Sequence, residues 1–524
     1  MKNILLFGAG KSATLLIDYL LENAPEEDWR LTVVDAHLPL VQEKLKGSPY
    51  GTALSFDVTD EIRRQYYIEQ SDIVLSLLPP LLHRLVAADC LHYRKHLLTA
   101  SYVDDEIARM GEEAAEKDLL FLCEMGLDPG LDHMSARKLI DDIRLKEGMV
   151  TSFLSHCGGL VAPASDDNPW HYKISWNPRN VVLAGKGGAV FRQNGKVENV
   201  PYEGIFAEKR YVVVPGHDLL CWYPNRDSES YAGKYALSHC PTFVRTTLRH
   251  PDFMYGWKNL VDLKLTDETL LYETDGKSLM EFFKEHLDRN QFNDWLEQRL
   301  QQQFQVTQQL LTDLMNLVEL EETSAKEGNE AVEDFLMVNS SGELQEVDMA
   351  DLKNNAAATI AFKMHEAKLT LKQLFFLGLD DGQTLINKGR CSAADVLQFA
   401  LEKKLALAEQ DKDMVVMMHE VEYELPEENP EVRGSGNEGH SEEEKRPRKK
   451  FRARSSMTLI GEDGQRTAMA KTVGLPMGVA TKLILAGRIP LRGLQIPTAK
   501  EIYVPVLNEL KKHGIEFTEQ HEEI

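Results

Sequence analysis

The chain has 524 residues, with 83 acidic and 59 basic side chains and a formal net charge of −24. A chain of this length predicts two or three domains with large buried cores. The acidic excess favours solubility and argues against a general nucleic-acid binder or a protein that binds anionic membranes.

The six cysteines are scattered along the chain without a CxxC pair. They are typical of reduced thiols in a cytoplasmic protein rather than of disulfides or a zinc site, so we expect no metal. Apolar runs are shorter than a transmembrane span, which predicts no membrane partner. The first residues already form a predicted strand, so we expect no signal peptide and a cytoplasmic location.

The first predicted unit is a strand, a glycine turn and a helix. Residues 4–7 form a short apolar run that predicts a buried strand, and Gly8, Gly10 and Ala13 follow it in the G-x-G-x-x-G/A pattern. In this pattern the first glycine makes a tight turn and the second lets the backbone approach a pyrophosphate. An apolar helix follows to Leu21, and its N-terminal N–H groups would hold the phosphates. The alternative is a purely structural turn.

A second predicted strand, at residues 31–34, ends at Asp35, which lies 22 residues beyond Ala13. A carboxylate in this place is expected to accept hydrogen bonds from ribose hydroxyls and to repel a 2′-phosphate. Because no arginine follows Asp35 directly, the sequence favours NAD, with NADP also possible. The residues expected at the dinucleotide are Gly8, Gly10, Lys11, Ser12, Ala13, Asp35, Asp57, Val58 and Leu77.

Four more strands are predicted in the first part of the chain, within the segments 52–58, 73–80, 96–103 and 118–123. Strands that alternate with helical stretches predict a parallel, doubly wound sheet. Asp57 follows the third strand, where such folds often contact the adenine. Tyr102 lies just past the fifth strand, at the sheet edge where ligands bind. A half-buried structural tyrosine is the alternative interpretation.

The ten residues 124–133, EMGLDPGLDH, follow the last of these strands and hold three carboxylates and a histidine. Glycine and proline fix an irregular backbone there, and charged groups at the end of an inner strand indicate a ligand crevice. The alternative is a polar loop in which Asp132 caps a helix that begins near His133.

The pattern changes after about residue 130. Residues 151–250 alternate strand-like pieces with polar, aromatic loops, and residues 257–405 have helical periodicity. Strands at 413–423 and 454–460 enclose a charged segment, predicted as a disordered loop over 425–453 because it holds too little apolar surface to fold. Its basic end could be a nuclear signal or an RNA patch, but a solvated loop neutralised by its own acidic half is favoured.

Long and unusual strings then carry a family resemblance: TASYV (99–103), EMGLDPGLDH (124–133), FLSHCGGLVAPASDDNP (153–169), YKISW (172–176), CWYPNRDS (221–228), VRTTLR (244–249) and AMAKTVGLPMGVATKLIL (468–485). The chain resembles the saccharopine reductases, the glutamate-forming saccharopine dehydrogenases, almost end to end. This resemblance implies an α/β fold with an N-terminal Rossmann domain, a second α/β domain with a mixed sheet, and an inserted all-helical domain. The implied bounds are 1–129 with a tail at about 500–524, then 130–256 with 406–499 for substrate binding and dimerisation, and 257–405 for the helices.

The resemblance also implies an activity. Saccharopine, NAD or NADP and water would be converted reversibly to L-glutamate and 2-aminoadipate 6-semialdehyde, by hydride transfer and imine hydrolysis in lysine metabolism. Near the reaction centre it implies Tyr102, Asp128 and Cys157, with Asp128 as the first candidate for acid/base work. A departure is His156, where relatives commonly have tyrosine; because histidine titrates near neutrality, it puts the pH profile in doubt.

Saccharopine carries three carboxylates, and arginine binds carboxylates through its bidentate fork. In the matching segments we therefore choose Arg226 and Arg245, with Lys173 and Arg179 as secondary candidates. The alternative for each is a surface ion pair. Two other hypotheses stay open: a related carboxynorspermidine or homospermidine synthase-type reductase, and a non-enzymatic NAD-binding module. We expect a homodimer.

Overall fold

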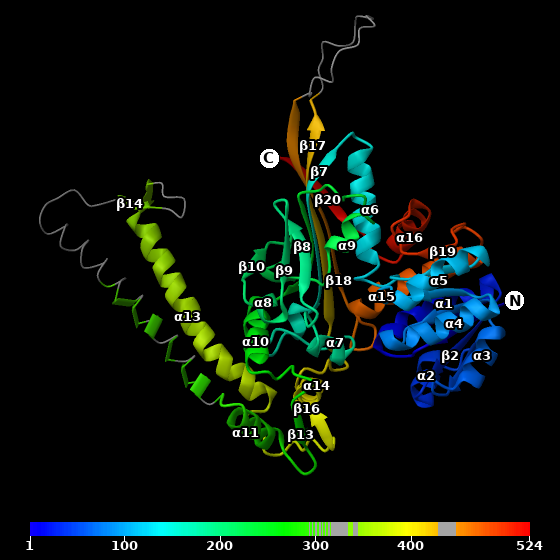
Figure 1. Cartoon of the computed structure of the whole chain (residues 1–524), viewed down its shortest axis with the longest axis horizontal. Coiled ribbons are helices and arrows are strands. Elements are labelled where there is room, and N and C mark those ends of the chain that lie inside the picture. Colours follow the sequence, from blue (N-terminus) through cyan, green and yellow to red (C-terminus); the bar gives the residue numbers. More distant parts are fainter. Residues whose placement is uncertain are drawn as a thin grey trace, which may run out of the picture. The chain divides into compact units, whose positions relative to one another are not determined.

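The computed structural model describes residues 1–292, 334–338, 344–427 and 447–524, together with scattered positions between 294 and 315. The chain divides into two compact units (Figure 1). The first comprises residues 1–167, 171–251 and 405–524, and the second comprises 168–170 and 252–404.

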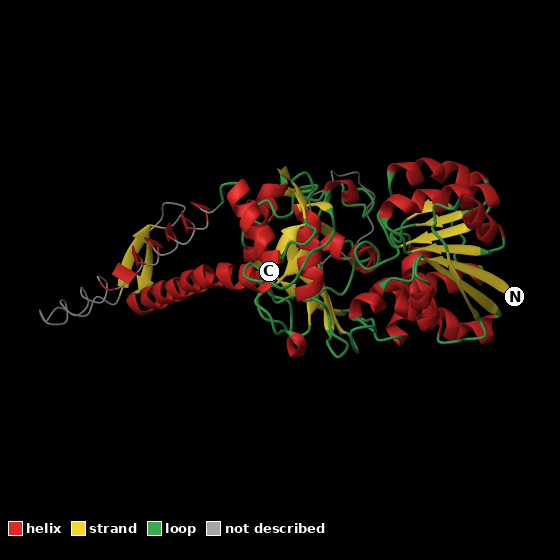
Figure 2. Cartoon of the chain, turned by 90° about the horizontal axis from the view of Figure 1, so that it is seen from below, coloured by secondary structure: helices red, strands yellow, loops and turns green. Residues whose placement is uncertain are grey.

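The first unit contains a seven-stranded parallel sheet in the order β19-β6-β5-β4-β1-β2-β3. Its strands are β1 (Lys2–Phe7), β2 (Trp29–Asp35), β3 (Gly51–Ser55), β4 (Ile73–Ser76), β5 (His96–Thr99), β6 (Leu120–Leu122) and β19 (Gly493–Gln495). Helices cover both faces of this sheet (Figure 2). Side chains on both sides of the inner strands are therefore buried, which explains why these strands are continuous apolar runs in the sequence. The predicted Rossmann sheet is confirmed.

The helices around this sheet are α1 (Thr14–Glu27), α2 (Leu38–Leu45), α3 (Glu61–Glu69), α4 (His83–Tyr93), α5 (Asp105–Glu116), α15 (Ala468–Leu485) and α16 (Lys500–Lys512), with 3-10 turns η1 (Lys11–Ala13) and η2 (Pro80–Leu82). Helix α15 packs closely on α1, since a Cβ on Gly474 would lie 2.8 Å from the Leu16 nitrogen. The C-terminal part therefore returns to the first sheet at 468, well before the predicted residue 500. The sequence could not show this, because α15 and β19 pack on helices and strands that lie several hundred residues earlier in the chain.

By length and composition, α15 is the one helix among the described residues that could cross a membrane, which corrects the expectation that no apolar run is long enough. However, 78 % of this segment is buried inside the protein. Apolar residues on all sides are typical of a helix enclosed by a core, and here α1, α16 and β17 enclose it.

The first unit also contains a nine-stranded sheet in the order β10-β11-β12-β7-β17-β18-β20, with β8 paired to β12 and β9 to β8. Strands β12 and β7 are parallel and the other pairs along this path are antiparallel, so the predicted mixed sheet is confirmed. The strands are β7 (Met149–Val161), β8 (Ala189–Gln193), β9 (Lys196–Val200), β10 (Arg210–Val212), β11 (Leu220–Pro224), β12 (Thr242–Arg249), β17 (Asp413–Pro426), β18 (Arg448–Ile460) and β20 (Thr518–Glu523). Its helices are α6 (Leu131–Arg144), α7 (Pro178–Val182), α8 (Tyr202–Ile205) and α9 (Glu229–Ala232), with the 3-10 turn η3 (Pro163–Ser165).

The end of the chain joins this second sheet, because β20 pairs with β18. The predicted tail over 500–524 is therefore divided: α16 packs on α15 and α6, and the last strand is an edge of the mixed sheet.

The second unit is built around α10 (Pro251–Asp262), α11 (Leu279–Arg289), α13 (Met349–Leu377) and α14 (Ala393–Lys404). It is not all-helical as predicted, because β13 (Leu271–Glu273) pairs with β16 (Arg390–Ser392), and β14 (Asp334–Val338) with β15 (Leu344–Asp348). Strands of three to five residues are too short to show a period of two beside long helical patterns. The indole of Trp170 packs edge-on against Trp257 in the core of this unit.

Strands β17 and β18 form a long hairpin that reaches into the predicted loop over 425–453 (Figure 1). Residues 425–426 and 448–453 are strand, and residues 428–446 lie outside the described part of the chain. The basic residues are neutralised across the sheet: Arg452 Nη2 lies 2.7 Å from Glu422, and Arg454 Nε lies 2.7 Å from Glu420. Glu522 on β20 contacts both arginines. The acidic partners of these arginines therefore lie on the neighbouring strands β17 and β20.

We predict that replacing residues 428–446 with a two-residue Asn-Gly turn leaves the fold and turnover almost unchanged. The Glu427 N–H already donates to the Pro447 carbonyl at 3.0 Å, so the two strands are paired up to the ends of the replaced segment and a short turn can join them. Thermal unfolding should shift by only about 2 °C, since long loops add little closure entropy. A large loss of solubility or of activity would show that the segment has a function of its own.

Candidate active site and cofactor site

The turn after β1 has the geometry that a dinucleotide needs. Gly8 has φ of +98°, and a Cβ there would lie 2.8 Å from the Leu77 carbonyl oxygen, so this turn requires glycine. Gly10 has φ of −62°, and a Cβ there would meet no atom within 4 Å. The space over Gly10 is therefore open to a ligand, above the backbone of Lys11, Ser12 and Ala13 in η1.

Two carboxylates follow β2 and β3 at the same sheet edge. Asp35 accepts hydrogen bonds from the backbone N–H groups of Ala9 at 2.8 Å and His37 at 3.0 Å, so both its oxygens hold the loop. Asp57 accepts from the backbone and hydroxyl of Thr59, which lower the pKa of Asp57, and Val58 beside it is buried.

Lys44 was not predicted to take part in this site. From α2 its Nζ reaches the Gly10 carbonyl and the Thr14 hydroxyl, and burial lowers its pKa to about 8. The glycine turn, the two carboxylates and this lysine fit a nicotinamide dinucleotide.

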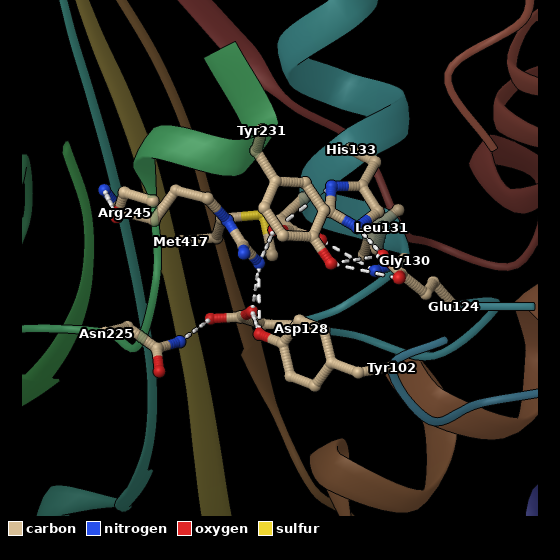
Figure 3. Close-up of polar contacts among 12 residues, drawn as sticks. Tyr102, Glu124, Asp128, Gly130, Leu131, His133, Asn225, Tyr231, Arg245 and Met417 are labelled. Carbon is tan, nitrogen blue, oxygen red and sulfur yellow. Dashed lines mark hydrogen bonds and ion pairs between the residues drawn. The ribbon is translucent and has the colours of Figure 1, made fainter. Parts of the chain in front are cut away.

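A second polar centre surrounds Asp128 (Figure 3). Tyr102 donates its hydroxyl proton to Asp128 Oδ1 at 2.9 Å, Arg245 Nη2 donates to the same oxygen at 2.6 Å, and Asn225 Nδ2 donates to Oδ2 at 3.1 Å. Arg245 Nη2 also lies 2.8 Å from Asp132 Oδ2. These residues come from the ends of β5, β6 and β11, from β12 and from α6, so the two sheets of the first unit build the centre together.

Arg245 is a buried cation with spare donors. Its side chain is 1 % exposed, and its Nε and Nη1 have no hydrogen-bond partner within the described ranges. The guanidinium lies over the rings of Tyr102 and Tyr231, at 5.6 Å and 4.6 Å from their centroids. Buried N–H groups of this kind are unfavourable until an acceptor binds them.

The two carboxylates that share Arg245 differ in their pKa values. Burial raises the pKa of Asp128 above its ordinary value, against the opposing effect of Arg245. Burial also disfavours the ionised form of Asp132, but His133 and Arg245, with the Gly130 N–H, outweigh it and lower its pKa. A pair of acids separated in this way is typical of acid/base sites.

Arg226 follows β11 and is exposed. Its guanidinium lies 5.1 Å from the centroid of the Tyr102 ring, and no described carboxylate pairs with it. Its φ of +50° is in the left-handed region, which is uncommon for a residue with a side chain. Arg226 is therefore a second cation near Asp128, open to solvent.

Other predicted residues lie elsewhere. Lys173 is buried, and its Nζ lies 2.9 Å from Asp167 Oδ2 and 2.8 Å from Asp411 Oδ2. Its charge is therefore already paired with two carboxylates of the protein. Arg179 lies in the first turn of α7.

Cys157 is buried on β7, and burial raises the pKa of its thiol well above the ordinary value. It packs in the apolar cluster with Met417 and Met469. A buried thiol with a raised pKa is a poor nucleophile.

His156 points to the opposite side of β7, as alternate strand residues do. Its Nδ1 lies 2.6 Å from the Thr246 hydroxyl, and burial lowers its pKa to about 3. A ring with this pKa is neutral near neutrality, so we expect His156 to leave the pH profile there unchanged.

Comparison with known proteins identifies the family. Residues 4–122 match the model of the saccharopine dehydrogenase NADP binding domain, and residues 126–515 match that of the saccharopine dehydrogenase C-terminal domain. The chain belongs to the saccharopine dehydrogenase family. It is an oxidoreductase of lysine metabolism, with a nicotinamide-dinucleotide domain formed by the first sheet.

Similar proteins include saccharopine dehydrogenase [NADP(+), L-glutamate-forming] of Saccharomyces cerevisiae, 30 % identical over 523 residues, and of Schizosaccharomyces pombe, 29 % identical over 524 residues. Each match covers 99 % of both chains. The chain is also 30 % identical to alpha-aminoadipic semialdehyde synthase of Arabidopsis thaliana, of which it spans 45 %. The structure of the apo Saccharomyces enzyme superposes with a TM-score of 0.73 and 28 % identity, over all of both chains.

Several polar residues of this dehydrogenase site were missed by sequence reasoning. Asp132 is not the helix cap of the alternative interpretation, since it accepts the Gly130 N–H at 2.6 Å and pairs with Arg245. Glu124, His133, Asn225, Tyr231 and Tyr235 were likewise not chosen. The first two stood in the singled-out run 124–133, and the others became visible only when β12 and α9 packed on it.

His83 is a further buried group at the edge of the first sheet. Its Nδ1 and Nε2 lie 2.8 Å from the hydroxyls of Ser76 and Ser101, and burial lowers its pKa to about 4. A neutral ring therefore joins the ends of β4 and β5 just before Tyr102.

We predict opposite effects of two alanine substitutions in the glycine turn. Gly10→Ala should keep the apoprotein's melting temperature and weaken dinucleotide binding, because the methyl group fills the open space. Gly8→Ala should destabilise the protein by about 1–2 kcal/mol or more, because alanine is strained at this φ and meets Leu77. Thermal unfolding and fluorescence titration of the dinucleotide measure the two effects. Normal dinucleotide binding by Gly10→Ala would contradict the site.

Proposed function

We propose that this protein is a glutamate-forming saccharopine dehydrogenase, which converts saccharopine, NADP and water to L-glutamate, 2-aminoadipate 6-semialdehyde and NADPH. The observation that carries the proposal is the buried Arg245 with two spare donor atoms beside an acid of raised pKa. The names of full-length fungal relatives support it. A homodimeric state and a cytoplasmic location stay predictions from the sequence.

Two cations suit a substrate with three carboxylates. Arg245 offers donors in a buried site, where a charge-assisted bond is strong, and Arg226 offers a solvated cation next to the same tyrosine ring. Together they would fix the orientation of the substrate's secondary amine, whose neighbouring carbon loses a hydride. When bound, the nicotinamide accepts this hydride.

Loss of the hydride leaves an iminium ion, to which water must add. Asp128 in its ionised form would take a proton from the attacking water, which forms a carbinolamine, and would return this proton to the nitrogen. It would then take the proton of the carbinolamine hydroxyl as the carbon–nitrogen bond breaks, which gives the semialdehyde and releases glutamate. Its raised pKa makes it a stronger base than an ordinary carboxylate. Tyr102, bonded to Asp128, and Arg245 would hold it in position.

The cofactor assignment to NADP rests on the family model and on the names of the relatives. Asp35, from which the sequence favours NAD, has both oxygens engaged by backbone N–H groups of the loop. Its role in this structure is to hold the glycine turn, so it has less capacity to bind a ribose. Lys44 supplies a cation on the same side.

We predict that kcat/KM with NADP exceeds that with NAD by about tenfold or more, a difference of roughly 1.4 kcal/mol in transition-state stabilisation. Initial rates of saccharopine oxidation with each cofactor give the ratio. A preference for NAD would restore the interpretation of Asp35 as a ribose ligand.

We predict different kinetic effects for the cations and for the acid. Arg226→Ala should raise KM for saccharopine about 10- to 150-fold, with a smaller change in kcat, because a carboxylate is charged in both the ground and the transition state. Arg245→Ala should raise KM in the same way and also lower kcat, because Arg245 holds Asp128 in position. Asp128→Ala should mainly lower kcat and remove the acidic limb of the pH profile, which should lie above the range of an ordinary aspartate. Steady-state kinetics over a range of pH test both. Arginine variants that lose kcat at constant KM would refute this division.

A further inference from the structure

A buried carboxylate behind the active site has no role in the chemistry above. Glu124 follows β6, its side chain is fully buried, and its φ is +58°. A buried charge and a left-handed backbone are both unfavourable for a residue with a side chain. Such a conformation persists only where the surroundings determine it, and it is often found at functional sites.

Three donors satisfy the Glu124 carboxylate (Figure 3). The Val103 N–H lies 3.1 Å from Oε1, the Tyr231 hydroxyl lies 2.9 Å and 3.0 Å from the two oxygens, and His133 Nε2 lies 2.8 Å from Oε2. Burial opposes ionisation of Glu124, but the hydrogen bond and charge of His133 and the Val103 N–H outweigh it and lower its pKa. Glu124 therefore joins the loop after β5, helix α6 and helix α9.

Two of these donors connect Glu124 to the two aromatic rings next to Arg245. One is the hydroxyl of Tyr231 itself, and the other is the N–H of the residue after Tyr102. Val103 directly follows Tyr102, and the rings of Tyr102 and Tyr231 both lie under the Arg245 guanidinium. The Tyr231 hydroxyl stays protonated, because burial and Glu124 raise its pKa. A phenol that donates to a carboxylate has a more electron-rich ring, and such a ring attracts a cation more strongly.

His133 supports the same arrangement. Its ring stacks on Tyr231 with centroids 5.4 Å apart, and its Nδ1 lies 2.6 Å from the Tyr235 hydroxyl. Its two ring nitrogens therefore contact Glu124 and Tyr235, so both are used. Neither Glu124 nor His133 has a hydrogen bond to Asp128 or Arg245 among the described residues.

We propose that Glu124 is a positioning residue of the proposed saccharopine dehydrogenase: through Tyr231 and the Tyr102 loop it holds the Arg245 guanidinium so that its spare N–H groups meet a substrate carboxylate. This inference rests on the proposed function and adds a specific residue pair to it. The competing explanation is a polar pair that only stabilises the fold. The two differ in measurable quantities, because a structural pair affects the melting temperature, whereas a positioning pair affects KM for saccharopine.

The test compares Tyr231→Phe, Glu124→Gln and the double variant with the wild type, as full chains. Tyr231→Phe keeps the ring over Arg245 and removes only the bond to Glu124. We expect it to raise KM for saccharopine about 5- to 20-fold, with kcat within about twofold and KM for the cofactor unchanged. Glu124→Gln should act in the same direction, and the double variant should be no worse than Glu124→Gln, since coupled groups are not additive.

Tyr423→Phe is the matched control, since it removes a buried tyrosine hydroxyl that lies 3.0 Å from His521, elsewhere in the mixed sheet. We expect Tyr423→Phe to lower the melting temperature about as much as Tyr231→Phe does, and to leave KM for saccharopine unchanged. Equal KM values for Tyr231→Phe and Tyr423→Phe would overturn the inference, as would additive effects in the double variant. If Glu124→Gln does not fold, the comparison of the two tyrosine variants decides. A wild type that fails to oxidise saccharopine would overturn the proposed function itself, and the inference with it.

Discussion

The candidate active site depends on the buried guanidinium of Arg245. Arg245 Nη2 serves Asp128 and Asp132 together, at 2.6 Å and 2.8 Å. Burying charges costs several kcal/mol per ion unless they are paired, so this cluster can form only when β12, the end of β6 and α6 have come together. Burial raises the pKa of Asp128, and the neighbouring charge of Asp132 raises it further, against the opposing effect of Arg245, so Asp128 holds its proton more firmly than an ordinary aspartate.

The two sheets of the first unit contribute unequal parts to this chemistry. The parallel sheet supplies the glycine turn and the ends of β4, β5 and β6, which are the places where ligands bind in open α/β sheets. The mixed sheet supplies the cations, since Arg226 follows β11 and Arg245 lies on β12. A substrate that bridges Asp128 and the cations therefore contacts both sheets, and neither sheet holds a complete site.

Much of the fold and part of the site could be predicted from local sequence. The turn at Gly8 follows from neighbouring residues, because the strand before it and the helix after it lie in one short segment. Its close approach to Leu77, after β4, is a tertiary contact that the local pattern does not show. By contrast, Asp132 looked like a helix cap, since its partner Arg245 is more than a hundred residues away. The surroundings of His156 could not be predicted for a related reason: the side of the sheet that a strand residue faces is set by the pairing of strands. Ion pairs across the hairpin of β17 and β18, and from Glu522 on β20, likewise could not be read from local sequence.

The return of the C-terminal part to both sheets affects how the protein can fold during synthesis. The strands β1 to β6 are complete at Leu122, but their neighbour β19 begins only at Gly493, and β18 gains β20 only at Thr518. Until then β6 has an open edge, and unpaired edges bind other chains. Contacts of such sequence separation also slow folding. The nascent chain therefore exposes an aggregation-prone edge for most of its synthesis, which makes it a candidate substrate for chaperones that bind unpaired strands.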